Sequence, residues 1–274
     1  MAGIQRCQTK KAQLKVLIVN TEDITGGAAI AAYRLHTALL VQGIDSQMLV
    51  QTKRSGDCTV IGPVSKVQKV ISFLRPIIDQ YPLKYYKNRT RALFSISWLP
   101  FNGIIDKINE VNPDIVHLHW ICGGMMRIED LRRIKAPIVW SLQDMWAFTG
   151  GCHYDEFCSL FQKDCSDCRV LGKSNCYYSK SGLKRKKYTY EKIRNLNLVP
   201  TSKCVSMMVN KSFAKKYVKN ILPNLLDVSL FKKHPKDMAK KYFNIHKDRK
   251  VILFTASNPL SDIRKGFNEL SEAL

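Results

Sequence analysis

The densest group of polar and aromatic residues lies between Ser141 and Tyr154, in the segment SLQDMWAFTGGCHY. Asp144 and His153 are residue types that exchange protons with a substrate or bind its hydroxyl groups. An aspartate in such a segment also often caps a helix or a turn, and this second interpretation stays open. The segment begins where a strand is expected to end, which is where ligands bind in parallel α/β sheets. We therefore predict catalytic or hydroxyl-binding roles for Asp144 and His153.

A second candidate site lies in IVHLHW, residues 115–120. We expect His117 and His119 on opposite sides of the strand's end, so that one faces a ligand crevice and the other packs. His119, which precedes Trp120, is the histidine that we expect to line a site. Histidines in such places are more often packed core or rim residues, so both roles stay open.

Gly26 and Gly27 stand between a first apolar run and a helical pattern. Without Cβ atoms the chain can approach a phosphate closely, and the free N–H groups of a helix start favour negative charge. Paired glycines are also ordinary turn formers. Their place directly after the first expected strand favours an anion-binding role.

Four cysteines fall within seventeen residues and end in a CxxC pair: Cys152, Cys158, Cys165 and Cys168. Four thiolates at this spacing suit a tetrahedral zinc ion that would staple a long loop. The alternative is that the thiols fill small buried spaces. The spacing predicts structural zinc without excluding this alternative.

Apolar runs alternate with helical patterns along the chain, which predicts an α/β fold with a doubly wound parallel sheet. Strands are expected at residues 14–20, 47–51, 59–62, 115–118, 138–142 and 198–200, and helices at 28–43, 103–111, 127–134 and 204–216. Residues 251–274 have the pattern of a strand, a loop and a helix that open a second domain.

The charge balance of 44 Lys+Arg against 22 Asp+Glu gives a net charge of +22, which implies an anionic partner such as nucleic acid, a phosphorylated substrate or an acidic membrane surface. The alternative is that the excess lysine only solvates the protein surface. The basic run Lys184 to Lys187, which includes Arg185, is most simply a solvated helix face. Together with the amphipathic segment Val67 to Ile78 they are the alternative candidate for a surface that binds anionic lipid. No nucleic-acid-binding motif is present, so we do not expect a nucleic-acid partner.

We find no apolar run of about 20 residues and no apolar signal-peptide core. A cytoplasmic protein is expected, and its nine cysteines should not form a disulfide framework.

Several of these segments together resemble the retaining glycosyltransferases of family 4, which have the GT-B fold. They are LKVLIVNTEDITGGAAIAAYRLHTALLVQG, PDIVHLHW, VWSLQDMWAFTGGCHYDEFCSLFQKDCSDC, VPTSK, ILPNLLDVSLFKK and ILFTAS with IRKGFNELSEAL. The branch that they resemble acts in colanic-acid-like and other exopolysaccharide pathways.

The resemblance implies transfer of a sugar from a UDP- or GDP-linked donor, with no catalytic metal, so that zinc would be structural. Gly26 and Gly27 would approach the donor's phosphates, and Lys265 would neutralise charge on the leaving diphosphate. His119 and the loop from Gln143 to His153 would line the pocket for the sugar and the acceptor. Many family members have a histidine where this chain has Gln143, which cannot relay a proton.

The resemblance also implies the domain order. Residues 1–13 would be a disordered N-terminus, 14–222 an acceptor-binding Rossmann-like domain, 223–249 a linker, and 250–274 the start of a truncated nucleotide-sugar-binding domain. We expect a glycosyltransferase fragment of cell-surface polysaccharide biosynthesis, associated peripherally with the inner face of the cell membrane. Its acceptor would be a lipid-linked saccharide or a polysaccharide, and the chain alone would have little or no activity. The alternatives are a non-catalytic acceptor- or lipid-binding module with a separately encoded partner, and a basic nucleic-acid-binding protein.

Overall fold

The computed structural model describes residues 13–100, 103–256, 260 and 262–274. The predicted disorder of residues 1–13 therefore lies almost wholly outside the described residues. The chain divides after Leu225 into two compact units. No helix within the described ranges is long and apolar enough to cross a lipid bilayer.

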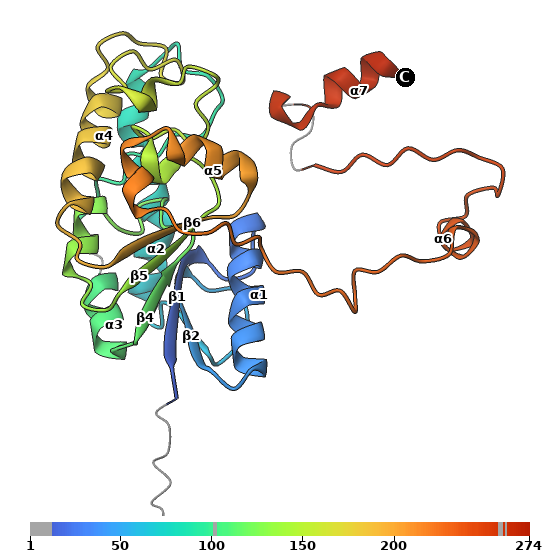
Figure 1. Ribbon diagram of the computed structural model, residues 1–274, viewed down its shortest axis with the longest axis horizontal. Coiled ribbons are helices and arrows are strands. Elements are labelled where there is room, and N and C mark those ends of the chain that lie inside the picture. Colours follow the sequence, from blue (N-terminus) through green and yellow to red (C-terminus); the bar gives the residue numbers. More distant parts are fainter. Residues whose placement is uncertain (1–12, 101–102, 257–259, 261) are drawn as a thin grey trace, which may run out of the picture. The chain divides into compact units, whose positions relative to one another are not determined.

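The first unit is built on one six-stranded sheet in which every neighbouring pair is parallel (Figure 1). Its strands are β1 (Lys15–Glu22), β2 (Asp45–Thr52), β3 (Val60–Ile61), β4 (Ile115–Leu118), β5 (Ile138–Leu142) and β6 (Leu196–Pro200). Their order, β3-β2-β1-β4-β5-β6, reverses direction between β1 and β4. This is the doubly wound order of Rossmann-like folds, in which ligands bind beyond the strand ends at the reversal. The predicted fold class is confirmed.

The connections between strands are helices of two kinds. The α-helices of the first unit are α1 (Gly27–Val41), α2 (Lys66–Gln80), α3 (Ile104–Val111), α4 (Tyr177–Tyr190) and α5 (Lys203–Asn210). The 3₁₀ turns are η1 (Tyr81–Tyr85), η2 (Ile128–Arg133), η3 (Trp146–Phe148), η4 (Leu160–Gln162) and η5 (Phe213–Tyr217). The helix predicted at 127–134 is therefore a 3₁₀ segment. The helix predicted at 204–216 ends at Asn210, because Ser212 starts a new turn by accepting a hydrogen bond from the Ala214 N–H.

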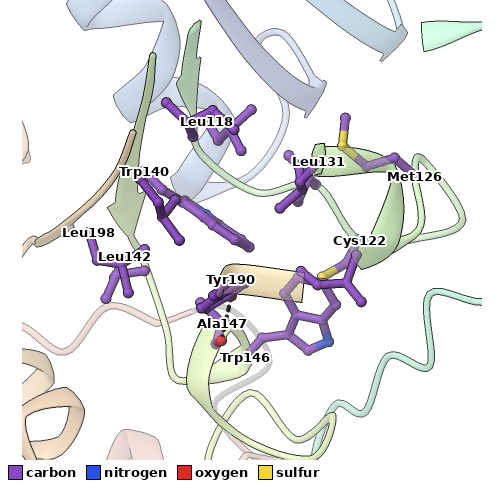
Figure 2. Packing of buried hydrophobic residues seen from close by; sticks show 14 of the residues in the cluster. Leu118, Cys122, Met126, Leu131, Trp140, Leu142, Trp146, Ala147, Tyr190 and Leu198 are labelled. Atoms are coloured by element: carbon purple, nitrogen blue, oxygen red, sulfur yellow. Dashed lines mark hydrogen bonds between the residues drawn. The ribbon is translucent and has the colours of Figure 1, made fainter. Parts of the chain in front are cut away.

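Alternate residues of β1 enter different hydrophobic clusters on the two faces of the sheet. Val16 and Ile18 pack with residues of α1 and β2, whereas Leu17 and Val19 pack with the larger cluster on the opposite face. Figure 2 shows the centre of the larger cluster, where Trp140, Trp146 and Tyr190 meet. The Tyr190 hydroxyl donates to the Ala147 carbonyl at 2.6 Å, so its polar end is satisfied within the core (Figure 2).

The second unit contains α6 (Lys236–Tyr242), η6 (Ile263–Lys265) and α7 (Phe267–Ala273). The predicted helix is present as α7, but the strand predicted at the start of the 251–274 segment is wrong. Residues 251–256 belong to no strand. A strand needs a hydrogen-bonded neighbour, and within the described residues after Leu225 no segment is a strand. Neither α6 nor α7 buries a side chain.

Candidate functional site

Asp144 lies just beyond β5, at the carboxyl edge of the sheet, and its carboxylate is held by three donors. Oδ1 accepts a hydrogen bond from the Trp146 N–H at 2.8 Å. Oδ2 accepts from Nδ1 of His153 at 2.6 Å and from Nε1 of Trp120 at 3.2 Å. The side chain keeps 15% of its surface exposed. The structure thus brings together the two residues predicted in this loop, Asp144 and His153.

His153 is fixed on its other side by a serine that lies far away in the sequence. With Nδ1 directed at Asp144, Nε2 forms the second hydrogen bond of the ring, with the Ser95 hydroxyl at 2.9 Å. The indole rings of Trp120 and Trp146 lie next to the imidazole, with centroids 5.5 and 6.4 Å away. Ser95 is 4% exposed, so its hydroxyl orients the ring and is not placed to attack a substrate.

The hydrogen bonds keep the Asp144 carboxylate ionised. Burial alone would raise the pKa of Asp144, but His153 and the N–H groups of Trp146 and Trp120 lower it below its ordinary value. A carboxylate with a lowered pKa is a good hydrogen-bond acceptor and a weak base. Sequence reasoning missed Ser95 and the hydrogen bond from Trp120, because no local pattern links either residue to the loop.

Lys186 of α4 anchors the loop that carries Asp144 and His153 through hydrogen bonds to its backbone. Its Nζ donates to the carbonyl oxygens of Trp146 and Thr149, the latter at 3.0 Å, and lies 4.0 Å from the Trp146 ring centroid. Burial lowers the pKa of Lys186 to about 8. The predicted solvated face is therefore wrong for part of the lysine run: Lys186 is buried, and Arg185 pairs with Glu129 at 2.5 Å.

Two glycines let this loop and α4 touch through their backbones. A Cβ atom on Gly182 would lie 2.0 Å from the carbonyl oxygen of Gly150, and one on Gly150 would lie 2.3 Å from that of Ser179. Gly151 has a φ of 149° and faces the Phe94 ring, which a Cβ would approach to 2.5 Å. The glycines in TGGC thus serve close packing of the loop.

His117 and His119 lie on the same face of β4, so the prediction of opposite sides is wrong. Residues i and i+2 of a strand share a face, and the two rings stack at 4.7 Å between centroids. Burial lowers the pKa of His117 to about 4, and burial together with His117 lowers the pKa of His119 well below its ordinary value. Both rings are therefore neutral at pH 7.

His119 keeps one buried nitrogen without a hydrogen-bond partner. Its Nδ1 lies 3.3 Å from Nε2 of Gln143, which also donates to Asn224 at 3.0 Å. Because the Gln143 amide donates to Nδ1, the proton of the neutral ring sits on Nε2, for which the structure gives no partner. An unsatisfied buried donor costs about 1–3 kcal/mol unless a ligand or a water molecule accepts from it.

A small cavity of about 10 Å³ lies among these groups. Its lining includes His119, Trp120, Cys122, Asp144 and Trp146. This volume is close to the roughly 10–15 Å³ that one water molecule needs, and it is far too small for a sugar ring. A sugar-sized ligand would therefore have to bind at the surface outside this cavity. The half-buried Trp120 and the exposed part of Asp144 lie there, and we call this surface the rim of the site.

The glycine turn after β1 leaves open space at the start of α1. Gly26 has a φ of 90°, and a Cβ atom on either Gly26 or Gly27 would meet nothing within 4 Å. The first turn of α1 contains no acidic residue, and the residue before it makes no side-chain cap. The turn itself is anchored by Asp23, whose carboxylate accepts from the N–H groups of Arg54 and Ser55. Lys265, the other predicted phosphate ligand, is an exposed residue of η6 in the second unit.

The four predicted zinc ligands are mostly buried thiols in apolar surroundings. Cys152 and Cys168 belong to a hydrophobic cluster with Leu83, Phe94 and Leu171, while Cys158 is half-buried. Burial, together with neighbouring thiols, raises the pKa of Cys165 to about 12 and that of Cys168 to about 11. Among the described residues, no three His, Cys, Asp or Glu side chains are grouped so that they could hold a metal ion. The arrangement fits space-filling thiols, and zinc binding stays a prediction.

Comparisons with known proteins give one curated relative and a set of solved structures, while no family model matches the chain. The chain is 23% identical over 168 residues to the "Putative colanic acid biosynthesis glycosyl transferase WcaC" of Escherichia coli (strain K12). The aligned part covers 58% of this chain and 40% of that protein.

Two of the similar solved structures are of Anabaena Alr3699/HepE. One is in complex with UDP and glucose (TM-score 0.43, 11% identity, 85% of this chain and 50% of that chain). The other is in complex with UDP (TM-score 0.43, 13% identity, 84% and 50%). The chain thus spans half or less of the length of these proteins, and the curated relative that it resembles is a glycosyltransferase.

Proposed function

We propose that the α/β unit is the acceptor-binding part of a retaining glycosyltransferase of cell-surface polysaccharide biosynthesis. The donor would be a UDP- or GDP-linked sugar, and the acceptor a lipid-linked saccharide at the inner face of the cell membrane. The observation that carries the proposal is the Asp144 carboxylate, held by His153 and Trp120 at the carboxyl edge of a Rossmann-like sheet. The similarity to WcaC supports the transferase class.

In this proposal Asp144 binds and orients the acceptor hydroxyl. Its depressed pKa keeps it ionised at neutral pH, so that it accepts a hydrogen bond from the attacking hydroxyl without itself removing the proton early. His153 and Ser95 are positioning residues, since they fix the carboxylate and do not reach the rim. Such fixation matters because small misplacements of reacting groups have large effects on rate.

The neighbouring groups would bind the rest of the acceptor. The half-buried indole of Trp120 offers an apolar face on which a sugar ring can stack. Its Nε1 already donates a hydrogen bond to Asp144. Nε2 of His119 would donate to a hydroxyl group directly or through a water molecule in the small cavity.

The donor's phosphates would lie over Gly26 and Gly27, where open space and the N–H groups of α1 suit an anion. Lys265 of the second unit would neutralise charge on the leaving diphosphate. No catalytic metal takes part in this proposal, and a zinc ion at Cys152, Cys158, Cys165 and Cys168 would be structural.

The test is binding of a water-soluble acceptor analogue, a short-chain isoprenyl diphosphate saccharide, measured by calorimetry. We expect Asp144→Asn to weaken binding at least tenfold and the exposed-site control Glu191→Gln to leave it within twofold. Equal affinity of Asp144→Asn and wild type would overturn the proposed acceptor site. Transfer from UDP- and GDP-linked sugars is assayed in parallel, and the anomeric configuration of any product tests retention.

A further inference from the structure

Helix α2 packs against the protein with its polar side and turns its apolar side to solvent. Ser72, Arg75, Pro76 and Asp79 are the buried or half-buried residues of the helix, and they recur at helical spacing. Seven large apolar residues are exposed by 42% to 71%: Val67, Val70, Ile71, Phe73, Leu74, Ile77 and Ile78. A surface helix of a globular protein has the opposite orientation, with the apolar stripe against the core.

This orientation is fixed by specific hydrogen bonds. Arg75 donates from Nε to the Gly124 carbonyl at 2.6 Å and from its terminal nitrogens to the carbonyls of Leu99 and Pro100 at 3.1–3.2 Å. Asp79, which is 1% exposed, accepts from the Trp98 N–H at 3.2 Å. A Cβ on Gly124 would lie 2.8 Å from the Arg75 carbonyl oxygen, so the helix backbone sits directly on the loop after β4. Rolling the helix over would break all of these contacts.

The start of the helix is also well defined. Ser65 accepts from the Gln68 N–H at 3.1 Å, and the Gln68 side chain accepts from the Ser65 N–H at 3.2 Å. This reciprocal capping box stabilises the first turn. The exposed apolar stripe therefore belongs to a formed helix, and it continues into η1 with the exposed Tyr81 and Tyr85.

The charges around the stripe are almost all positive. Residues 66–91 contain seven Lys and Arg, and their single acidic residue, Asp79, is buried. Lys66 and Lys69 are exposed on the first turn, and Lys84, Lys87 and Arg91 are exposed just after the helix. An apolar stripe bordered by lysines and tyrosines suits the interface of an anionic bilayer, where the apolar face enters and the basic groups meet lipid phosphates.

We propose that α2 and η1 form a membrane-docking face that binds anionic phospholipid bilayers. The basic run 184–187 is not part of it, because Lys186 and Arg185 are engaged inside the protein. This face lies outside the sugar-transfer site proposed above and needs neither donor nor acceptor. The anionic lipid would then be the partner that the net charge of +22 implies, and α2 with η1 would be the surface that binds it.

The experiment is co-sedimentation of the whole chain with sucrose-loaded vesicles in the absence of sugars. One set contains phosphatidylethanolamine and phosphatidylglycerol in a three-to-one ratio, and the other contains only phosphatidylcholine. We expect the wild type to partition at least tenfold better onto the anionic vesicles. Phe73→Ser/Ile77→Ser should lower this partition at least tenfold, and Lys66→Gln/Lys69→Gln should lower it severalfold on anionic vesicles alone.

Two matched controls remove similar groups elsewhere. Val41→Ser/Met207→Ser replaces exposed apolar residues of α1 and α5, and Lys180→Gln/Lys184→Gln replaces exposed lysines of α4. Both should stay within twofold of the wild type. All substituted residues are exposed, so folding is checked simply by circular dichroism.

The proposal is overturned if Phe73→Ser/Ile77→Ser binds vesicles as the wild type does, or if the wild type does not bind them. It is also overturned if the wild type self-associates in sedimentation velocity without lipid and this variant becomes monomeric, because a second copy would then cover the stripe. A failure of acceptor binding would leave these results unchanged, so the two proposals fail separately.

Discussion

Nδ1 of His153 lies 2.6 Å from Oδ2 of Asp144, while Nε2 of the same ring lies 2.9 Å from the Ser95 hydroxyl. The imidazole is thus held at both nitrogens, and the carboxylate that it holds is the only member of the three that reaches the surface. The orientation of Asp144 therefore depends on a residue 58 positions before His153 in the sequence.

Replacing Ser95 with alanine removes the partner of Nε2 and leaves Asp144 in place. We expect the free energy of unfolding to fall by about 1–2 kcal/mol, because a buried acceptor loses its donor. Binding of the acceptor analogue should weaken about threefold to tenfold as the ring loosens. Urea denaturation and calorimetry measure the two effects, with Ser174→Ala at an exposed position as control. Unchanged stability together with unchanged binding would mean that the serine does not support the site.

Asp144→Asn should change stability in a pH-dependent way. The pKa of Asp144 is lowered in the folded state, so its ionised form stabilises the protein above the unfolded-state pKa near 3.8, and this contribution is lost as pH falls through the lower folded-state pKa. We expect the variant to be less stable than the wild type at pH 7 by about 1–3 kcal/mol, and the difference to shrink below pH 3.8. A difference that stays constant down to the lowest pH at which the protein folds would contradict this account.

His117 should make the protein less stable in mild acid. Its folded-state pKa of about 4 lies below the ordinary value of 6.5, so the unfolded chain binds the proton first as pH falls. Stability from this group is complete above pH 6.5 and decreases by up to about 3 kcal/mol toward pH 4. His117→Gln should flatten the slope of unfolding free energy against pH in this range. An unchanged slope in the His117→Gln variant would contradict this account.

Lys186→Met should destabilise the loop that carries the site. The substitution keeps the apolar stem and removes the donor that serves the carbonyl oxygens of Trp146 and Thr149. We expect a loss of about 1–3 kcal/mol, because two buried carbonyl oxygens lose a charged partner. The control is Lys184→Met, at an exposed position of α4 two residues before Lys186. It should change the free energy of unfolding by less than about 0.5 kcal/mol. Similar losses for both variants would show that the buried contacts are not what stabilises the loop.

The cysteines should react with a thiol reagent according to their exposure. Cys58 and Cys204 are exposed and should be labelled in the folded protein, whereas Cys122, Cys152, Cys165, Cys168 and Cys176 should need unfolding. Mass spectrometry of labelled peptides distinguishes these sites, and rapid labelling of the five buried thiols would contradict the packing.

Metal analysis of the protein, purified without chelator, tests the zinc prediction. One zinc ion per chain would support the prediction, and the absence of zinc would contradict it.

The sheet was predictable from the sequence because buried parallel strands are nearly continuous apolar runs. The expected strands at 115–118 and 138–142 coincide with β4 and β5. Asp144 and His153 were predictable as site residues for the same reason, since the end of β5 fixes where their loop begins, but their direct contact was not. The second unit shows the limit of this signal: residues 251–254 are apolar, but no strand forms there without a neighbour within the described residues.

The remaining features depend on contacts between distant segments, which no local pattern encodes. Helical periodicity identified the stripe from Val67 to Ile78, but it could not tell that Arg75 and Asp79 hold the opposite side of the helix against the protein. The basic run 184–187 gave no sign that Lys186 packs against the Trp146 ring or that Arg185 pairs with Glu129. The partnership of Ser95 with His153 depends on a bridge between residues 94 and 152, which the tertiary fold creates.

The contact between Gly150 and Gly182 leaves no room for even a methyl group. A larger residue at either glycine would push the loop that carries Asp144 and His153 away from α4. It would displace the Asp144 carboxylate without contacting any ligand. Attempts to change substrate preference should therefore vary the surface near Trp120 and leave Gly150 and Gly182 untouched, because the loop and α4 contact each other through their backbones there.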